Sequence, residues 1–257
     1  MPDITYAASG LGVGLLVGLT GVGGGSLMTP LLILLFGVHP ASAVGSDLLY
    51  AASTKAVGTA VHGLHGSVGW RIVGLLAAGS VPATAFTILL AAYLGIGGGG
   101  RSHFIAVALG IVLLLTAAVM LCQKQVVAAV SGLLGRTGRV NTPALTVLVG
   151  AMLGVMVTLT SVGAGAIGMT ALLILYPKLP AVRLVGSDIA HAVPLTLLAG
   201  FGHWWLGTVD FGLVGSLLAG SIPGIILGSL LSNRVPERSL RVCLALVLTA
   251  VAFTLIL

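Results

Sequence analysis

The chain has 257 residues, of which 58% are hydrophobic and only 6% are charged, and its mean hydropathy is +1.20. Soluble domains carry roughly 25% charged residues, so this composition excludes a soluble globule and indicates an integral membrane protein. The net charge of +6 does not indicate nucleic-acid binding, because the basic residues are scattered singly or in pairs at the ends of apolar segments.

Apolar runs long enough to cross a bilayer, which takes about 17–25 residues, follow one another along the chain. They cover residues 5–36, 42–62, 72–94, 103–121, 143–176, 184–206, 211–231 and 241–257. The first and fifth runs are too long for one simple helix, and each is interrupted at a glycine-rich centre, at 21–25 and 161–165. Glycine costs about 1 kcal/mol in a helix interior, so we expect each of these two runs to form two short helices joined by a turn.

The chain also contains an internal repeat. Segment 73–82 reappears as 214–223, and segment 44–47 returns as 185–188 at the same offset. One inserted residue near position 181 accounts for the slightly shorter offset between the glycine-rich centres. Duplicated membrane units are common in transporters, whose substrate site lies where the two copies meet. We therefore divide the chain into a first transmembrane repeat (1–122), a cytoplasmic linker (123–141) and a second transmembrane repeat (142–257).

The positive charges decide between two topologies. If each broken run crosses once, giving eight simple transmembrane helices, the basic residues outside the spans divide almost evenly between the two sides. If each broken run instead turns back as a re-entrant hairpin, Arg101 stands alone on one side and all the others share the opposite side. Those others are Arg71, Lys124, Arg136, Arg139, Lys178, Arg183, Arg234, Arg238 and Arg241. The positive-inside rule favours the second topology, with the basic side cytoplasmic.

The predicted fold is therefore an all-α polytopic membrane protein with two inverted repeats, each made of a glycine-broken re-entrant hairpin and three membrane-spanning helices. Three crossings per repeat invert the second copy relative to the first, so one hairpin enters from outside and the other from the cytoplasm. The two glycine-rich turns can then meet near the midplane, with both termini extracytoplasmic. The linker 123–141 mixes apolar and basic residues and is expected to form a short interfacial helix.

The two glycine-rich turns are candidate substrate sites. A helix that begins just after each turn presents free backbone N–H groups and the positive end of its dipole, which suits an anion without placing a cation in lipid. The alternative is that the glycines only let helices approach closely. The candidate substrate-binding residues are Thr20, Gly21, Gly23, Gly24, Gly25 and Ser26 in the first repeat, and Thr160, Ser161, Gly163 and Gly165 in the second.

Ionisable residues inside the spans are further candidates, because they are costly in a membrane and are usually functional. Lys55 is the only deeply placed cation, and we assign it to substrate binding, with pairing to Asp47 or Asp188 as the structural alternative. Asp47, Asp188 and His191 are candidates for proton coupling. Both aspartates follow Gly-Ser, so they are also candidate helix caps or first-turn acids, and His191 is equally suited to a structural hydrogen bond. His203, close to the end of its run, is expected at the membrane interface.

No metal site, cofactor or disulfide is expected. Cys122 and Cys243 form no spaced pair and occupy non-equivalent places in the two repeats. Residues 1–3 include no positive charge, so we expect no signal peptide ahead of the first apolar run.

Four segments together resemble the TauE/SafE family of sulfite and organosulfonate exporters. They are GVGGGS at 21–26, VGSDLLYAASTK at 44–55, GSVGWR at 66–71 and GSDIAHAVPL at 186–195. The resemblance implies movement of sulfite, sulfoacetate, thiosulfate or related sulfonates across the cytoplasmic membrane. Some related thiosulfate carriers relay their substrate through central cysteines, whereas neither Cys122 nor Cys243 lies in a glycine-rich turn of this chain.

We therefore expect a secondary transporter, not an enzyme, that exports sulfite or an organosulfonate by alternating access, with proton coupling as an option. An importer of thiosulfate or sulfonate on the same fold, and an anion channel, stay open as alternatives. An intramembrane enzyme using Asp47 and Asp188 is the least favoured reading. The expected partners are the sulfur oxyanion and lipid of the cytoplasmic (inner) membrane, with a homo-oligomer as an option and no nucleic acid.

Overall fold

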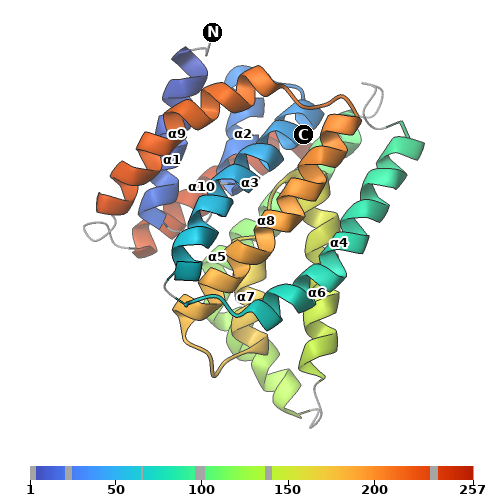
Figure 1. Ribbon diagram of the computed structural model, residues 1–257, viewed down its shortest axis with the longest axis vertical. Coiled ribbons are helices and arrows are strands. Elements are labelled where there is room, and N and C mark those ends of the chain that lie inside the picture. Colours follow the sequence, from blue (N-terminus) through green and yellow to red (C-terminus); the bar gives the residue numbers. More distant parts are fainter. Residues whose placement is uncertain are drawn as a thin grey trace.

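The computed structural model describes residues 4–20, 25–64, 66–95, 102–136, 141–231 and 237–256, and the regular elements in these ranges are all α-helices (Figure 1). They are α1 (Ile4–Thr20), α2 (Gly25–Phe36), α3 (Pro40–Leu64), α4 (Trp70–Tyr93), α5 (Ser102–Arg136), α6 (Thr142–Thr160), α7 (Ala166–Leu175), α8 (Ala181–Trp205), α9 (Phe211–Leu231) and α10 (Glu237–Ile256). Four stretches of the described chain are long and apolar enough to cross a membrane: Trp70–Tyr93, Ala106–Leu133, Thr142–Thr160 and Ala181–Trp205. The prediction of an all-α membrane protein is confirmed for these ranges.

Both overlong apolar runs are divided between two helices, as predicted. The first run supplies α1 and α2, and the second supplies α6 and α7. At the second break Ser161 has a φ of 58° and Gly163 a φ of 111°, both in the left-handed region. A residue in this conformation ends a helix because the chain leaves the helical path there. The turn between α6 and α7 therefore begins where the glycine pattern placed it.

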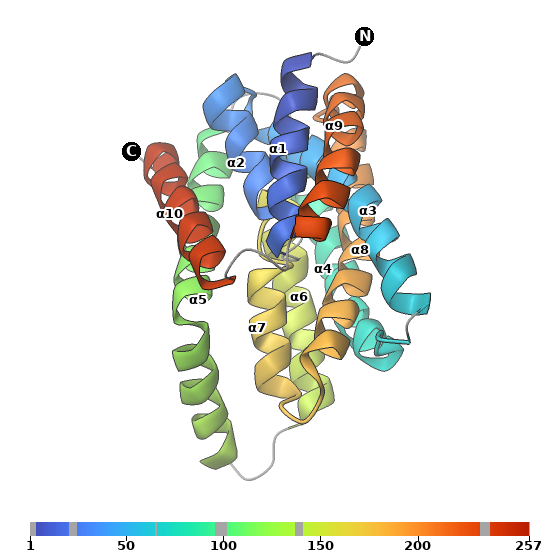
Figure 2. The ribbon, with the colours of Figure 1, turned by 90° about the vertical axis from the view of Figure 1, so that its left-hand side faces the viewer.

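The predicted linker helix is part of α5, which extends to Arg136. Cys122 interrupts α5 with a φ of −102° and a ψ of 16°, so the helix bends just before Gln123. Figure 2 shows the segment beyond the bend leading away from the other helices at the lower end of the molecule. The bend thus coincides with the predicted boundary between the first repeat and the linker, and it lies within the apolar stretch Ala106–Leu133.

The first helix of each repeat packs on the fourth helix of the other repeat, α1 on α9 and α6 on α4. Glycines make these contacts close: a Cβ on Gly10 would collide with the backbone carbonyl of Leu217, and one on Gly150 with that of Leu76. Gly10 is equivalent to Gly150, and Leu217 to Leu76, in the repeat alignment. Small residues of this kind let helix backbones approach where lipid offers no hydrophobic driving force. Equivalent residues thus build equivalent interfaces.

Two further helix pairs also join the two repeats. α3 packs on α8, and α5 packs on α10. In Figure 2, α1 and α2 occupy the upper half of the molecule, whereas α6 and α7 occupy the lower half. α3 and α8, each of 25 residues, extend between these halves and bring their polar residues into the interior.

The repeated Gly-Ser-Asp motif ties the two repeats together through its serines. Ser46 accepts a hydrogen bond from the backbone N–H of Asp210 at 3.0 Å, and Ser187 accepts one from the N–H of Gly69 at 2.9 Å. Gly69 directly precedes α4 and Asp210 directly precedes α9, which are the fourth helices of the two repeats. Each of these residues is bound by a serine of the other repeat. Both serines are fully buried, and each supplies the hydrogen-bond partner that a backbone N–H group needs away from water.

Matching hydrogen bonds also close the turns after α3 and α8. The Nδ1 atom of His62 lies 2.8 Å from the Ser67 hydroxyl, and that of His203 lies 3.0 Å from the Thr208 hydroxyl. His203 is only 7% exposed, and its Nε2 lies 2.9 Å from the carbonyl oxygen of Thr158 on α6. His203 therefore faces the protein interior, and its predicted depth at the membrane interface stays a prediction.

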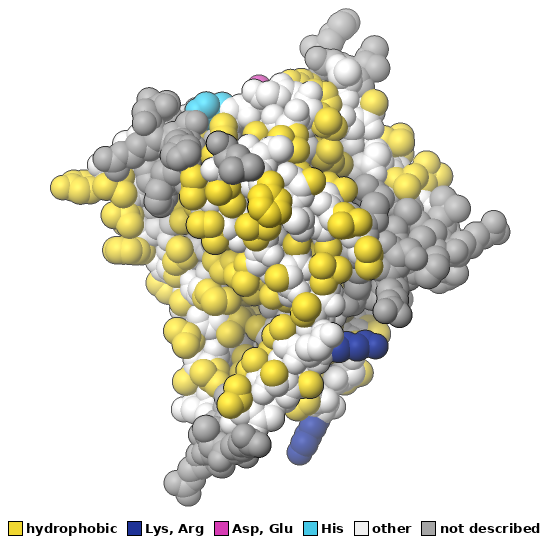
Figure 3. Space-filling model, turned by 180° about the vertical axis from the view of Figure 1, so that it is seen from behind, with side chains coloured by type: hydrophobic (Ala, Val, Ile, Leu, Met, Phe, Trp, Pro, Cys, Tyr) yellow, Lys and Arg dark blue, Asp and Glu magenta, His cyan; other side chains and the backbone are white. Residues whose placement is uncertain are grey.

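The outer surface is apolar over most of the face shown in Figure 3, and lysine and arginine side chains gather towards its lower end. Large exposed hydrophobic residues include Phe86, Leu148, Trp205 and Phe253. A soluble monomer rarely exposes a contiguous apolar surface of this extent, so this face fits contact with lipid.

Candidate functional site

The two aspartates lie in helix interiors and cap nothing. α3 begins at Pro40 and α8 at Ala181, so Asp47 and Asp188 each lie about two turns inside their helix. Neither helix has an acidic residue in its first turn. The interpretation as helix caps or first-turn acids is therefore wrong. The Gly-Ser that precedes each aspartate serves helix packing and the serine tie between repeats instead.

Asp47 is completely buried and is held by α2. The Thr29 hydroxyl donates to its Oδ2 at 2.6 Å, while its Oδ1 has no hydrogen-bond partner. The Ser161 side chain, from the turn between α6 and α7, faces the same carboxyl, yet its hydroxyl forms no hydrogen bond with it. The turn of the second repeat and the aspartate of the first repeat thus meet in the interior.

Asp188 lies in a matching place on α8. Its Oδ1 sits directly against Gly168 of α7, where any Cβ would collide with it, and this oxygen has no hydrogen-bond partner. Gly168 is thus the residue that leaves room for the carboxyl, a role the sequence analysis missed. Its glycine character carried no signal because the residue lies outside the turn.

Lys55 lies between the two carboxyls. Its side chain is 8% exposed, and its ammonium interacts electrostatically with Asp188 and Asp47. Within the described chain, no carboxylate oxygen comes within 4.0 Å of it to close an ion pair. Lys55 therefore does not form the direct ion pair with Asp47 or Asp188 that was the structural alternative. Its positive charge stays available to another negatively charged group.

His191 is fully buried and uses one of its two ring nitrogens. Its Nε2 lies 2.9 Å from the Ser80 hydroxyl on α4, and its Nδ1 has no partner. Tyr50 occupies the equivalent position of α3, is 1% exposed, and faces Ser221, the equivalent of Ser80. The Tyr50 hydroxyl also closes no hydrogen bond. The two repeats therefore place one polar ring each at matching points of the interior.

Sequence reasoning missed Tyr50 as a site residue. An aromatic residue in an apolar helix is ordinarily a core residue, and its ring does pack in the same cluster as Val13, Met28 and Val162. The available signal was its alignment with His191 in the internal repeat. Ser80 and Thr29 carried no comparable signal, because their role depends on which helices meet.

The turn between α6 and α7 is buried, with Val162 fully enclosed and Ser161 4% exposed. The Thr160 hydroxyl donates to the carbonyl oxygen of Met156 on α6 at 2.7 Å and accepts from the Val162 amide of the turn at 3.2 Å. The amides of Ile167 and Gly168 donate to the Gly163 carbonyl, so they are not free. The expectation of free helix N–H groups is therefore wrong for these two amides.

Four other amides of this turn donate to no group in the described chain: those of residues 163–166, which include Gly163 and Gly165. Gly163 and Ala164 are buried and Gly165 and Ala166 are half-buried, and N–H groups without partners in such places are rare and mark sites where a ligand or water binds. The second turn thus keeps donors of the type that the sequence analysis required for an anion.

The first turn cannot be compared in this way. Gly21, Gly23 and Gly24 lie outside the described residues. Thr20 ends α1 and Gly25 and Ser26 begin α2, with their side chains also outside the description. Their assignment to the substrate site stays a prediction.

The described interior therefore has one polar centre made of groups from both repeats. Its members without a hydrogen-bond partner are Asp47 Oδ1, Tyr50 OH, Ser161 Oγ, Asp188 Oδ1 and His191 Nδ1. Since most buried polar side-chain atoms in proteins are hydrogen-bonded, so many open groups around a buried ammonium indicate a place built for a polar ligand, a proton or water.

Comparison with known proteins gives a consistent result. The family described as "Sulfite exporter TauE/SafE" matches residues 6–255. The chain is 39% identical over 263 aligned residues to "Probable membrane transporter protein YjnA" of Bacillus subtilis (strain 168), covering 99% of this chain and all of that protein. It is 26% identical to "Probable membrane transporter protein YdhB" of the same organism (88% of each chain) and 26% identical to a "Probable membrane transporter protein" of Xylella fastidiosa (strain 9a5c), covering 90% of this chain and 85% of that one. No solved structure matches the chain. The match across nearly the whole length, on an all-helical fold with several membrane-length helices, shows that this multi-pass membrane transporter belongs to the sulfite exporter TauE/SafE family.

Proposed function

We propose that the protein is a secondary transporter that exports a small sulfur-containing oxyanion, sulfite or an organosulfonate, across the cytoplasmic membrane. The observation that carries the proposal is the polar centre, where Lys55 is surrounded by open groups from both repeats. A buried cation without a contact ion pair is costly unless another negative group joins it. A small oxyanion supplies that charge and accepts hydrogen bonds from hydroxyl and amide donors.

The donors for this anion come from both repeats. The Tyr50 hydroxyl and Lys55 belong to α3, and Ser161 and the amides of residues 163–166 belong to the turn between α6 and α7. The predicted donors of the first turn, Thr20 to Ser26, complete the set in this proposal. An anion held between helices of different repeats is released when the repeats move apart, which is what alternating access requires.

Proton coupling follows from the two carboxyls beside the same centre. An ionised carboxylate repels an oxyanion, so Asp47 and Asp188 take up protons when the anion binds. His191 has a free Nδ1 at the same centre and can pass a proton to or from them. Transport in this scheme moves protons together with the anion and depends on the pH gradient.

The inverted architecture is part of the proposal. Exchange of equivalent contacts between α1–α9 and α6–α4 supports a two-fold relation between residues 1–122 and 142–257, joined by the cytoplasmic linker 123–141. The location of α1 and α2 in one half of the molecule and of α6 and α7 in the other supports hairpins that enter from opposite sides (Figure 2). The eight-crossing alternative lacks a charge bias between the sides.

Substitution of Lys55 by methionine tests the central claim. We expect sulfite flux in proteoliposomes to fall at least tenfold, because the buried charge that binds the anion is lost. The thermal stability is expected to hold or rise, since removing a buried unpaired charge relieves a desolvation cost. Lys124→Met is the matched control, because Lys124 is exposed on α5, and it is expected to leave flux unchanged. Undiminished flux in Lys55→Met contradicts the proposal.

Direction and mode of movement separate the two alternatives. Intact cells that make an exporter lose preloaded sulfite faster than control cells, whereas cells that make an importer accumulate external thiosulfate or sulfonate. A channel passes current that neither saturates at low millimolar anion nor shows counterflow driven by anion on the opposite side. Saturable counterflow supports the transporter.

A further inference from the structure

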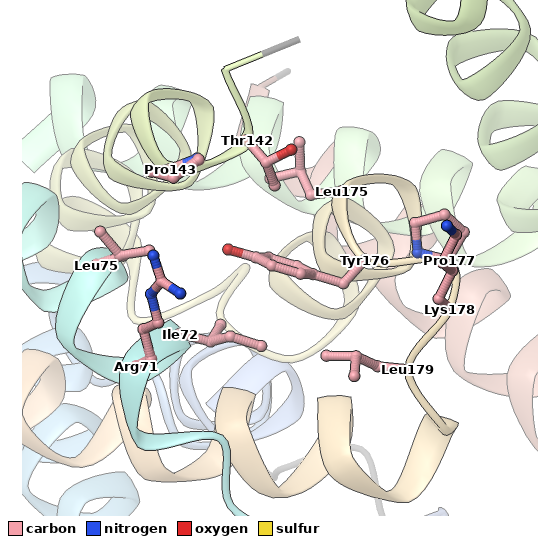
Figure 4. A pocket seen from close by; sticks show the side chains of 10 residues that line it. All are labelled: Arg71, Ile72, Leu75, Thr142, Pro143, Leu175, Tyr176, Pro177, Lys178 and Leu179. Carbon is pink, nitrogen blue, oxygen red and sulfur yellow. The ribbon is translucent and has the colours of Figure 1, made fainter.

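A cavity lies away from the polar centre, between the beginnings of α4 and α6 and the end of α7. Its volume is about 550 Å³. Figure 4 shows Arg71 and Lys178 on opposite sides of the Tyr176 ring. None of the described residues that line the cavity is acidic, and the rest of its wall is largely apolar, formed by Ile72, Leu75, Pro143, Leu175, Pro177 and Leu179. The cavity thus combines positive charge with a hydrophobic wall.

Tyr176 is fixed as part of that wall. Its hydroxyl lies 2.8 Å from the Thr146 hydroxyl, which itself donates to the carbonyl oxygen of Thr142 at 2.8 Å. The single proton of Thr146 is used in this second bond, so the Tyr176 hydroxyl donates to Thr146. This hydrogen bond therefore fixes the Tyr176 side chain in the wall of the cavity.

The equivalent place in the other repeat is built from different residues. Tyr176 and Thr146 correspond to Phe36 and Tyr6, whose rings pack on each other with centroids 4.9 Å apart. The cations Lys178 and Arg71 correspond to Val38 and Gly212. The positive-inside rule accounts for basic residues on one side of a membrane, but it does not account for the replacement of a packed ring pair by a hydrogen-bonded tyrosine beside a cavity.

We infer that this cavity binds an oxyanion that carries a short apolar group. The guanidinium of Arg71 holds the anionic end, Lys178 adds positive charge on the opposite side of the cavity, and the leucine and proline side chains of the wall hold the apolar part. Arginine suits this role because its planar fork matches sulfonate and phosphate oxygens. A short alkylsulfonate and the headgroup of an anionic phospholipid share this chemistry. The site stands apart from Lys55 and functions without it.

The test uses the full chain carrying Lys55→Met, so that the polar centre does not contribute. The double variant Arg71→Gln with Lys178→Gln is compared with Lys124→Gln, which removes an exposed cation outside the cavity. Calorimetry in lipid-free uncharged detergent measures ethanesulfonate binding, and native mass spectrometry measures retained phosphatidylglycerol. We expect the double variant to lose at least tenfold in affinity for ethanesulfonate or most of its retained phosphatidylglycerol, and the control to keep both.

The probe that is lost identifies the source of the anion. If the double variant does not fold, Leu75→Trp fills the cavity without touching either cation and is expected to cause the same loss. The inference is overturned if neither probe binds the Lys55→Met parent, or if the double variant and the control bind both probes alike. Failure of this site leaves the transport test at Lys55 unaffected, because the two readouts are measured separately.

Discussion

At the scale of single residues, the most informative pair is Tyr50 and His191. They are equivalent in the internal repeat, and both are buried. Tyr50 faces Ser221 on α9 and His191 faces Ser80 on α4, so each faces a serine on the fourth helix of the other repeat. One carries a phenol that can donate to an anion, and the other an imidazole that can carry a proton. The two copies of one ancestral position have therefore taken different chemistry, which fits a centre that handles both an anion and a proton.

Replacing Tyr50 by phenylalanine removes only the open hydroxyl. Because that hydroxyl has no hydrogen-bond partner, we expect the free energy of unfolding to change by less than about 1 kcal/mol. The KM for sulfite is expected to rise about tenfold, the equivalent of one hydrogen bond to a charged group. Tyr93→Phe, at a position 88% exposed, is the control and leaves KM unchanged. An unchanged KM in Tyr50→Phe would exclude the hydroxyl from substrate binding.

At the scale of elements, the glycine seams between α4 and α6 and between α1 and α9 are the strongest packing constraint. A Cβ at Gly79 would collide with the Val147 carbonyl, and one at Gly220 with the Ala7 carbonyl. These are backbone atoms and cannot move aside as a flexible side chain would. Any larger residue at either glycine must push two helices apart.

Gly79→Leu is therefore expected to destabilise the protein by about 1–3 kcal/mol, the range for overpacking in a tight interface. Gly74→Ala in the same helix is the matched control, since a Cβ there meets nothing within 4 Å. That change is expected to be neutral or stabilising by up to about 1 kcal/mol, because alanine favours the helix. Thermal unfolding in detergent measures both, and equal melting temperatures for the two variants would contradict the packing argument.

The helices themselves were predictable, whereas much of the site was not. Glycine clusters indicated the break after Thr160, and charge indicated the basic segment after Cys122, because both depend on local sequence. The capping interpretation of Asp47 failed because helix α3 begins at Pro40, and a run of Ala, Ser and Val gives no sharp signal for a helix start. The partners of Asp47 and His191, Thr29 and Ser80, depend on tertiary contacts and leave no trace in spacing.

At the scale of the whole molecule, the repeats are interlocked. Helices that begin one repeat lie on helices that end the other, and the serines of each Gly-Ser-Asp motif bind the backbone of the other repeat. The proposed two-fold relation in the membrane plane predicts which loops lie on the same side of the membrane.

Cysteine labelling in intact cells tests that statement. In a background without Cys122 and Cys243, single cysteines at Lys124 and Lys178 are expected to react from the same, cytoplasmic side. With eight simple crossings they would react from opposite sides. A cysteine at Asp210 serves as the reporter for the other face. The inverted hairpins are ruled out if a membrane-impermeant reagent labels the cysteines at positions 124 and 178 from opposite sides of the membrane.

The seam between α1 and α9 has a further consequence during synthesis. α1 leaves the ribosome first, yet the helix that covers its glycines is made about 200 residues later. The glycine-containing face of α1 therefore stays unpacked in the bilayer until α9 has been synthesised. If the two halves are expressed separately, we expect each to be degraded quickly. Co-expression is expected to restore the amounts of both, because each half contains the helices on which the other packs.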